Sequence, residues 1–415
     1  MAVHSLHFVL KLLTVVLLTA APCLPLGDGL ERRISSELNP HCTLAQCNTS
    51  HYSVVYVKAE GPNDTLHYVW DLTAKPSVLL ALTDKDSNLT IDWRGFIDGE
   101  DGSITFSTDP LYSFGIIIDK VWEFNDINDT GMFRADMNSS YIKELDTQFF
   151  NWNRTQFREE EKSMVLTAEA NGYNDSVVTK NGTLRVEVEV FGFNDHSENL
   201  PHLLHTSNTT QVDMVFDRLT TDPSFNNSRF AVEFVIVSQD QRNGTMIVDV
   251  RKSLDDEHTP GVFTLVDVES PSSHSRSSGG YLQWKPVAYL AQNRDISNST
   301  VTNVYGPIKS PPKALDSSLL SAYYGSQLTN GSQTLVQAVT VSFGESDDGF
   351  YKKTKYTSWT FAIGYGKPPN EDFSLLVILV ISIGLGLPAL LVVISGIVMS
   401  IRKISQNKDD LLLSS

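Results

Sequence analysis

Leu184-Arg185-Val186-Glu187-Val188-Glu189-Val190 alternates apolar and charged side chains without a break. A period of two residues predicts a β-strand with one buried face and one solvent face. Further runs of strand length, rich in β-branched or aromatic residues, are Ser53–Val57, Ser77–Leu82, Phe114–Ile118, Phe230–Val237, Met246–Val250 and Leu335–Phe343. No segment before residue 373 shows a long period of 3.6 residues. The large N-terminal part is therefore predicted to be mainly antiparallel β and sandwich-like.

Turn signals separate these strands. Asn-Gly pairs stand at 171–172, 181–182, 243–244 and 330–331, and such pairs favour tight turns. The Ser-rich stretch 270–280 and the Pro-rich stretch 307–312 are expected to be linkers or long loops. A short helix is the expectation for the acidic run Glu159-Glu160-Glu161. A division into two β subdomains between 170 and 280 remains an alternative.

One long apolar segment lies near the C-terminus. Residues 373–401 contain no charged side chain, and Arg402 and Lys403 follow at once. A helix of this length exceeds the ~30 Å hydrocarbon core of a bilayer. Because basic residues stay in the cytosol, the span predicts a luminal domain at 28–372 and a cytosolic tail at 402–415.

The N-terminus predicts a secretory signal peptide over residues 1–27. Its apolar run, Leu12 to Ala21, is about half the length that a span needs, and small residues follow it. Cleavage could fall after Ala21, Cys23 or Gly27. The chain is thus expected to be a single-pass type I membrane protein.

Two cysteines remain after the signal peptide, Cys42 and Cys47. In an oxidising compartment a pair this close favours one small disulfide loop over a metal site, which would need two more ligands.

Thirteen Asn-x-Ser/Thr sequons all lie between the two apolar segments: Asn48, Asn63, Asn88, Asn128, Asn138, Asn153, Asn174, Asn181, Asn208, Asn226, Asn243, Asn298 and Asn330. A chain of this length would hold roughly three by chance. Their density predicts a heavily N-glycosylated luminal domain. Such cover shields a backbone from proteases, although it can also serve folding and solubility alone.

The sequence shows no catalytic signature. It lacks the Gly-x-Ser-x-Gly, His-Glu-x-x-His and P-loop motifs, and its net charge of −17 argues against nucleic acid as a partner. His202 and His205, with His196 and Glu198 upstream, could form a metal cluster, but the intervening Pro201 favours a surface loop. We expect no enzyme activity, cofactor or metal. A carboxylate pair for glycoside hydrolysis is left open by the many acidic residues.

The membrane segment carries a seam of mostly small side chains. Its members recur at a 4-3-4-3-4 spacing: Ser382, Gly386, Ala389, Val393, Gly396 and Ser400. Small residues let another helix approach closely in lipid. The seam therefore predicts a partner helix, although Gly, Ala and Ser are common in spans that only anchor.

The short tail contains an acidic dileucine-like pattern made by Asp409, Leu412 and Leu413. Patterns of this kind are read by sorting adaptors on the route to endosomes and lysosomes. The tail is too short for a signalling domain.

Three stretches resemble the glycosylated lysosomal membrane protein family: Val121–Asp126, Tyr281–Tyr289 and Ser358–Gly366. The resemblance covers nearly the whole chain and implies residence in the lysosomal membrane without enzymatic activity. It also implies a role as accessory subunit of a lysosomal major-facilitator transporter for dipeptides, which the subunit binds, stabilises and protects from proteolysis. Family tails end in a tyrosine-based signal, and this tail has no tyrosine, so delivery would rest on the leucines or on the partner.

Two other functions stay open: a membrane-tethered lysosomal hydrolase and a cell-surface adhesion receptor. The first predicts a luminal pocket with two facing carboxylates, and the second a sugar-free ligand face at the plasma membrane. A homodimer through the luminal domain is a further alternative.

Overall fold

The computed structural model describes residues 31–48, 52–239, 244–253, 258–270, 279–316, 318–328, 334–370 and 375–413. The signal peptide and most of the Ser-rich stretch lie outside these residues. The chain divides into a β unit, which runs to Arg251 and resumes at Thr264–Pro369, and a second unit with Lys252–Phe263 and the C-terminal helix. The limits of the signal peptide and of the luminal domain remain predictions.

Two large antiparallel sheets make up most of the β unit. The first has the order β1-β2-β3-β4-β7-β15-β21-β20, with β8 beside the second half of β7. Its strands are β1 (Arg33–Leu38), β2 (Val54–Glu60), β3 (Asp64–Asp71), β4 (Ser77–Asp84), β7 (Tyr112–Asn125), β8 (Ile142–Asp146), β15 (Ser228–Ser238), β20 (Ser299–Lys309) and β21 (Leu335–Phe343).

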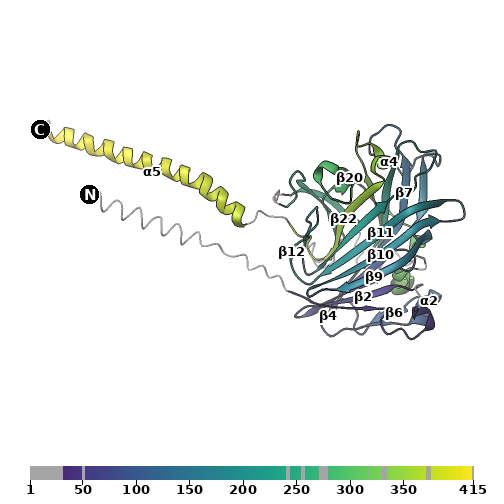
Figure 1. Cartoon of the computed structure of the whole chain (residues 1–415). Coiled ribbons are helices and arrows are strands. Elements are labelled where there is room, and N and C mark those ends of the chain that lie inside the picture. Colours follow the sequence, from purple (N-terminus) through teal and green to yellow (C-terminus); the bar gives the residue numbers. More distant parts are fainter. Residues whose placement is uncertain are drawn as a thin grey trace. The chain divides into compact units, whose positions relative to one another are not determined.

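The second sheet has the order β9-β10-β11-β14-β22-β18-β17, and β19 pairs with another part of β22. Its strands are β9 (Phe150–Glu159), β10 (Ser163–Asn174), β11 (Thr179–Phe191), β14 (Thr209–Asp217), β17 (Thr264–Glu269), β18 (Gly280–Trp284), β19 (Val287–Tyr289) and β22 (Tyr356–Tyr365). With β16 (Ile247–Lys252) the two sheets form one curled array of 18 strands (Figure 1).

Strand β20 joins the sheets at one edge. Its first residues pair with β19, and from Thr302 onward it pairs with β21. At the opposite edges the backbone N–H and the hydroxyl of Ser36 on β1 donate to Glu159 on β9. Both junctions protect sheet edges that would otherwise be open to other strands.

The core fills the space between the sheets. Leu184, Val186, Val188 and Val190 on β11 are at most 1% exposed and pack with alternate residues of both sheets. The predicted sandwich-like β architecture is confirmed, because the alternation turns every second side chain inward.

Short elements cover the outer face of the first sheet. Leu319 and Leu320 of α3 pack on this face with Trp93 of α2. A Cβ on Gly115 would lie only 2.4 Å from a methyl group of Leu320, so glycine permits this close approach. These elements are η1 (Ala45–Asn48), β5 (Leu89–Ile91), α2 (Trp93–Asp98), β6 (Ile104–Phe106), η4 (Pro312–Leu315), α3 (Leu319–Tyr324) and η5 (Gly325–Leu328).

The remaining elements are η2 (Thr147–Phe149), β12 (Asp195–His196), β13 (Leu204–His205), η3 (Ile296–Asn298), α4 (Phe350–Thr354) and α5 (Leu375–Leu413). Helix α5 contains an apolar span, Val377–Lys403, long enough to cross a membrane. This span confirms the predicted C-terminal apolar helix. The helix continues beyond it to Leu413, within the predicted cytosolic tail.

Three local predictions were wrong. The acidic run at 159–161 ends β9 and begins a turn instead of a helix. Asn171-Gly172 and Asn181-Gly182 lie inside β10 and β11, where the register shifts between Asn171 and Tyr173, so these glycines serve a bulge and not a hairpin turn. Pro307 lies within the edge strand β20, also at a register shift. The turns predicted at 243–244 and 330–331 fall wholly or partly outside the described residues.

Candidate functional site

Three adjoining hollows lie on the outer face of the second sheet. Their cavity volumes are about 460, 420 and 370 Å³. The largest, here called the acidic groove, shares Glu187, Glu198, Asn199 and Asp213 with the smallest. None of the residues that line the three hollows is the asparagine of a sequon.

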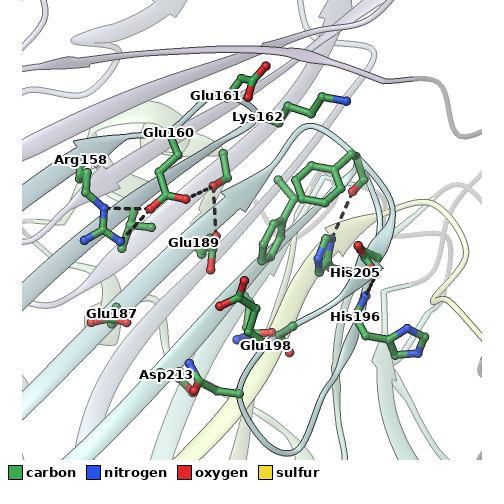
Figure 2. A pocket seen from close by; sticks show the side chains of 18 residues that line it. Arg158, Glu160, Glu161, Lys162, Glu187, Glu189, His196, Glu198, His205 and Asp213 are labelled. Carbon is green, nitrogen blue, oxygen red and sulfur yellow. Dashed lines mark hydrogen bonds and ion pairs between the residues drawn. The ribbon is translucent and has the colours of Figure 1, made fainter. Parts of the chain in front are cut away.

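Strand register places the charged side chains of the acidic groove. Since the even-numbered residues of β11 and β14 fill the core, the odd-numbered ones face outward. Glu189 pairs with Val165 on one side and with Gln211 on the other. Two residues along β11, Glu187 pairs with Asp213. Figure 2 shows Glu187, Glu189, Glu198 and Asp213 around one hollow.

The groove is strongly acidic. Its lining includes seven carboxylates: Glu160, Glu161, Glu187, Glu189, Asp195, Glu198 and Asp213. The lining also contains two basic side chains, Arg158 and Lys162. Arg158 forms an ion pair with Glu160 at 2.8 Å. Lys162 forms one at 2.9 Å with Glu31, which lies outside the lining.

The carboxylates differ in their partners. Asp213 pairs with Arg294 at 3.0 Å. Glu187 accepts a hydrogen bond from Thr167 at 3.3 Å, and Glu189 accepts one from Ser163 at 3.1 Å. Burial raises the pKa of Glu189; the Ser163 hydrogen bond opposes this rise, and the nearby charges of Glu160 and Glu187 reinforce it. Glu189 therefore holds its negative charge less readily than an exposed glutamate.

Gln211, in the lining of the groove, has a buried side-chain oxygen that no described residue satisfies. Its side chain is 6% exposed, and its Oε1 accepts no hydrogen bond from any described residue. A buried amide oxygen without a donor costs about 1–3 kcal/mol. The strand pattern places the Gln211 side chain on the outer face, beside Glu189, in the lining of the groove.

The loop between β11 and β14 closes one side of the groove. His205 stacks on Phe191 with ring centroids 3.5 Å apart, and its Nδ1 lies 3.2 Å from the carbonyl of Phe193. Burial lowers the pKa of His205 to about 4, so the ring is neutral. The Nδ1 of His202 lies at hydrogen-bond distance, 2.7 Å, from the carbonyl oxygen of Ser197. In the described part of the chain no three His, Cys, Asp or Glu side chains converge as a metal site.

Most sequon asparagines lie on the surface. Side chains are described for nine of the thirteen, and eight of these are exposed: Asn63, Asn88, Asn128, Asn138, Asn174, Asn181, Asn226 and Asn298. Asn208 is half-buried, and its Oδ1 accepts a hydrogen bond from Arg32 at 2.8 Å. For Asn48 and Asn153 only the backbone is described, and Asn243 and Asn330 lie outside the described residues. Glycan attachment stays a prediction.

The cysteine pair forms the disulfide Cys42–Cys47. Both cysteines contact the hydrophobic cluster on the outer face of the first sheet. The bond thus fixes the loop that follows β1.

The seam residues lie on one face of α5. Within the second unit, a Cβ added at Gly386 or Gly396 would meet no atom within 4 Å. The hydroxyl of Ser400 donates to the carbonyl of Gly396 at 2.9 Å, so this polar group is satisfied inside the helix. Asp409, Leu412 and Leu413 lie on the last turns of α5, and their side chains are not among those described.

Sequence reasoning identified the seam but missed the groove. Arg185, Glu187 and Glu189 were used only as evidence for a strand. The alternation at Leu184–Val190 could have indicated the groove. It places Glu187 and Glu189 on the same outer face of one strand, and this follows from the sequence without knowledge of the neighbouring strands. Gln211 carried no signal, since its burial depends on the loop that covers it.

Comparison with known proteins agrees with the resemblance noted from the sequence. The family model described as "Glycosylated lysosomal membrane protein" matches residues 53–406. The Danio rerio protein of that name is 31% identical over 413 residues, which is 97% of each chain. The Homo sapiens protein of the same name is 28% identical over 396 residues, covering 94% of this chain and 92% of the relative. "Glycosylated lysosomal membrane protein A" of Xenopus laevis is 28% identical over 382 residues, 90% of this chain and 91% of the relative. The chain belongs to the glycosylated lysosomal membrane protein family.

Proposed function

We propose that this protein is a non-catalytic accessory subunit of a lysosomal major-facilitator transporter for dipeptides. The proposal has three parts: the protein binds the transporter, stabilises it and protects it from luminal proteases. Sorting adaptors that read Asp409, Leu412 and Leu413 would direct the pair to the lysosome.

The observation that supports binding most strongly is the seam of α5. A helix that only anchors a domain needs apolar side chains of any size. Here the small side chains of Gly386, Ala389 and Gly396 leave a shallow strip along one face of the helix. In lipid, close packing against a neighbouring helix is the interaction that such a strip favours.

The protective part of the proposal rests on the exposed sequons. Eight exposed asparagines are distributed over loops and strand ends of the β unit. Glycans there would keep proteases away from the backbone, while the three hollows on the outer face of the second sheet, whose linings contain no sequon asparagine, would remain open to a partner.

Co-purification tests the proposal. The intact protein, carrying an affinity tag, is extracted from lysosomes in mild detergent, and the proteins that elute with it are identified by mass spectrometry. We expect a multi-span transporter in amounts close to equimolar. Recovery of this chain without any multi-span protein would contradict the proposal.

A tethered hydrolase has one observation in its favour. The acidic groove contains Glu189, whose pKa is raised, beside Glu187, and glycosidases pair a protonated with an ionised carboxyl group. These two glutamates, however, stand side by side on one strand and do not face each other across a cleft. Release of sugar from a panel of aryl glycosides, lost in Glu189→Gln, would favour this alternative over the accessory role.

A further inference from the structure

The acidic groove has more negative charge than its own residues neutralise. Arg158, Lys162 and Arg294 are each committed to one carboxylate. Among the described residues, Glu187 and Glu189 receive only hydroxyl hydrogen bonds, from Thr167 and Ser163. The charge of Arg158 reaches Glu189, and Arg185 lies two residues from Glu187 on the same face, but in the described part of the chain neither glutamate forms an ion pair.

An independent observation points to the same place. Gln211 Oε1 is a buried acceptor without a donor among the described residues, and Gln211 is the cross-strand neighbour of Glu189. The repulsion between the carboxylates of the groove does not account for the missing donor to Gln211, so the two observations are independent. A ligand that brings positively charged N–H groups would satisfy both features at once.

The geometry disfavours a metal ion. Ca²⁺ and Mg²⁺ require several oxygen atoms gathered about one point, and no such group of three is present in the described part of the chain. Glu187 and Glu189 are two residues apart on a strand, so their Cα atoms are about 7 Å apart. Such spacing suits an ammonium group with three donors or a guanidinium group with five.

The wall of the groove also has an apolar part. Val165, Phe191 and Phe193 line it next to the carboxylates. Val165 and Phe191 are at most 9% exposed, so an aliphatic stem would lie along their accessible edges and along Phe193 while its charged end reaches the glutamates. A small inorganic cation would leave this surface unused.

We propose that the acidic groove binds an organic cation, an ammonium or guanidinium group on an aliphatic stem, held by Glu187, Glu189 and Gln211. The ligand is either a free amine or the basic side chain of a peptide, and the two share this chemistry. This site is separate from the seam of α5, and it stands whether or not the accessory role does.

Calorimetric titration of the full-length protein in detergent at neutral pH tests the site. The probes are cadaverine for free amines and the blocked tripeptide acetyl-Ala-Lys-Ala-amide for peptide side chains. Saturable one-site binding of either probe is expected, and the tighter of the two identifies the source. Absence of saturable binding by both overturns the proposal.

The variants Glu189→Gln and Gln211→Leu are expected to weaken binding by about tenfold and by at least about threefold respectively. Glu169→Gln is the matched control, because Glu169 lies on the same outer face and outside the acidic groove. It should keep the dissociation constant within about twofold. Equal weakening by Glu189→Gln and Glu169→Gln would reveal nonspecific charge attraction and overturn the site.

Two further measurements keep the result interpretable. Glu187→Gln replaces Glu189→Gln if that variant loses its cooperative thermal transition, with the same expected loss. Titration with CaCl₂ alone should give no saturable binding. If calcium binds and displaces cadaverine, the groove is a metal site and the proposal is wrong.

Discussion

Arg229 shows how single residues hold the β unit together. Its side chain is 1% exposed and forms ion pairs with Asp126 at 2.8 Å, Asp129 at 2.6 Å and Asp348 at 2.6 Å. Burial acts to raise the pKa of Asp126, but the N–H groups of Thr130 and Gly131 and the Arg229 guanidinium outweigh it, so the pKa is lowered. The charged form of Asp126 thus stabilises the fold above its unfolded pKa, and this contribution is lost only as the pH falls through the lower folded value. The cluster therefore persists in a mildly acidic compartment.

Replacing Arg229 by methionine would leave these carboxylates without their cation. We expect a loss of about 3–5 kcal/mol in the free energy of unfolding, because one partner of a buried ion cluster is removed. Chemical unfolding of the detergent-solubilised chain, followed by tryptophan fluorescence, measures it. Arg134→Met is the control, since Arg134 makes an exposed pair with Asp136; its midpoint should not move. Equal midpoints for the two variants would contradict a structural role for the cluster.

His67 has the opposite pH dependence. Its ring nitrogens lie 2.8 Å from the hydroxyls of Tyr56 and Thr83, and burial lowers its pKa to about 3. The neutral ring contributes stability that is full above the unfolded pKa near 6.5 and is lost as the pH falls toward the folded value. Between pH 7 and pH 5 this loss is about 2 kcal/mol.

Substituting His67 by glutamine removes that component. The variant should start from a lower stability at pH 7 and lose about 2 kcal/mol less than the unmodified protein on going to pH 5. Unfolding curves at pH 8, 7, 6 and 5 give the comparison. Between pH 8 and pH 7 the two proteins should change in parallel, and parallel curves down to pH 5 would show that His67 is not the titrating group.

At the scale of elements, the sequence predicted strands best where alternation or β-branched runs were strongest. The run Leu335–Phe343 coincides with β21, and Phe230–Val237 lies within β15. Strands such as β14 and β22 were missed, because their polar residues mask the period until the neighbouring strands are known. Asn-Gly pairs misled in β10 and β11, since a glycine with positive φ serves a bulge as well as a turn. The acidic groove escaped prediction for a similar reason: it depends on which strands are neighbours.

The seam of α5 permits a sharp test at this scale. Gly386→Leu and Gly396→Leu would fill the strip that we propose as the contact for a partner helix, and we expect each to lower the amount of co-purified transporter about tenfold. Gly384→Leu is the matched control, because Gly384 is two residues from both Ser382 and Gly386 and so lies on the other side of the helix. Retention of the transporter by the seam variants, or its equal loss in Gly384→Leu, would exclude the seam as the contact.

At the scale of the whole molecule, the account requires that the β unit face the lumen. The exposed sequon asparagines should then carry glycans, and protease added to intact lysosomes should remove only the tail after Arg402. Treatment with an N-glycosidase should increase gel mobility, and peptide mapping should find modification at the exposed sites. Unaltered mobility would place the β unit on the other side of the membrane.

Under the proposed function, this protein keeps a transporter intact in the lysosomal membrane. The most direct measurement is the half-life of the co-purifying transporter in cells with and without this chain, determined by pulse labelling. We expect a markedly shorter half-life when the chain is absent, and recovery when the full chain or the Gly384→Leu variant is returned. A transporter half-life that does not depend on the chain would contradict it.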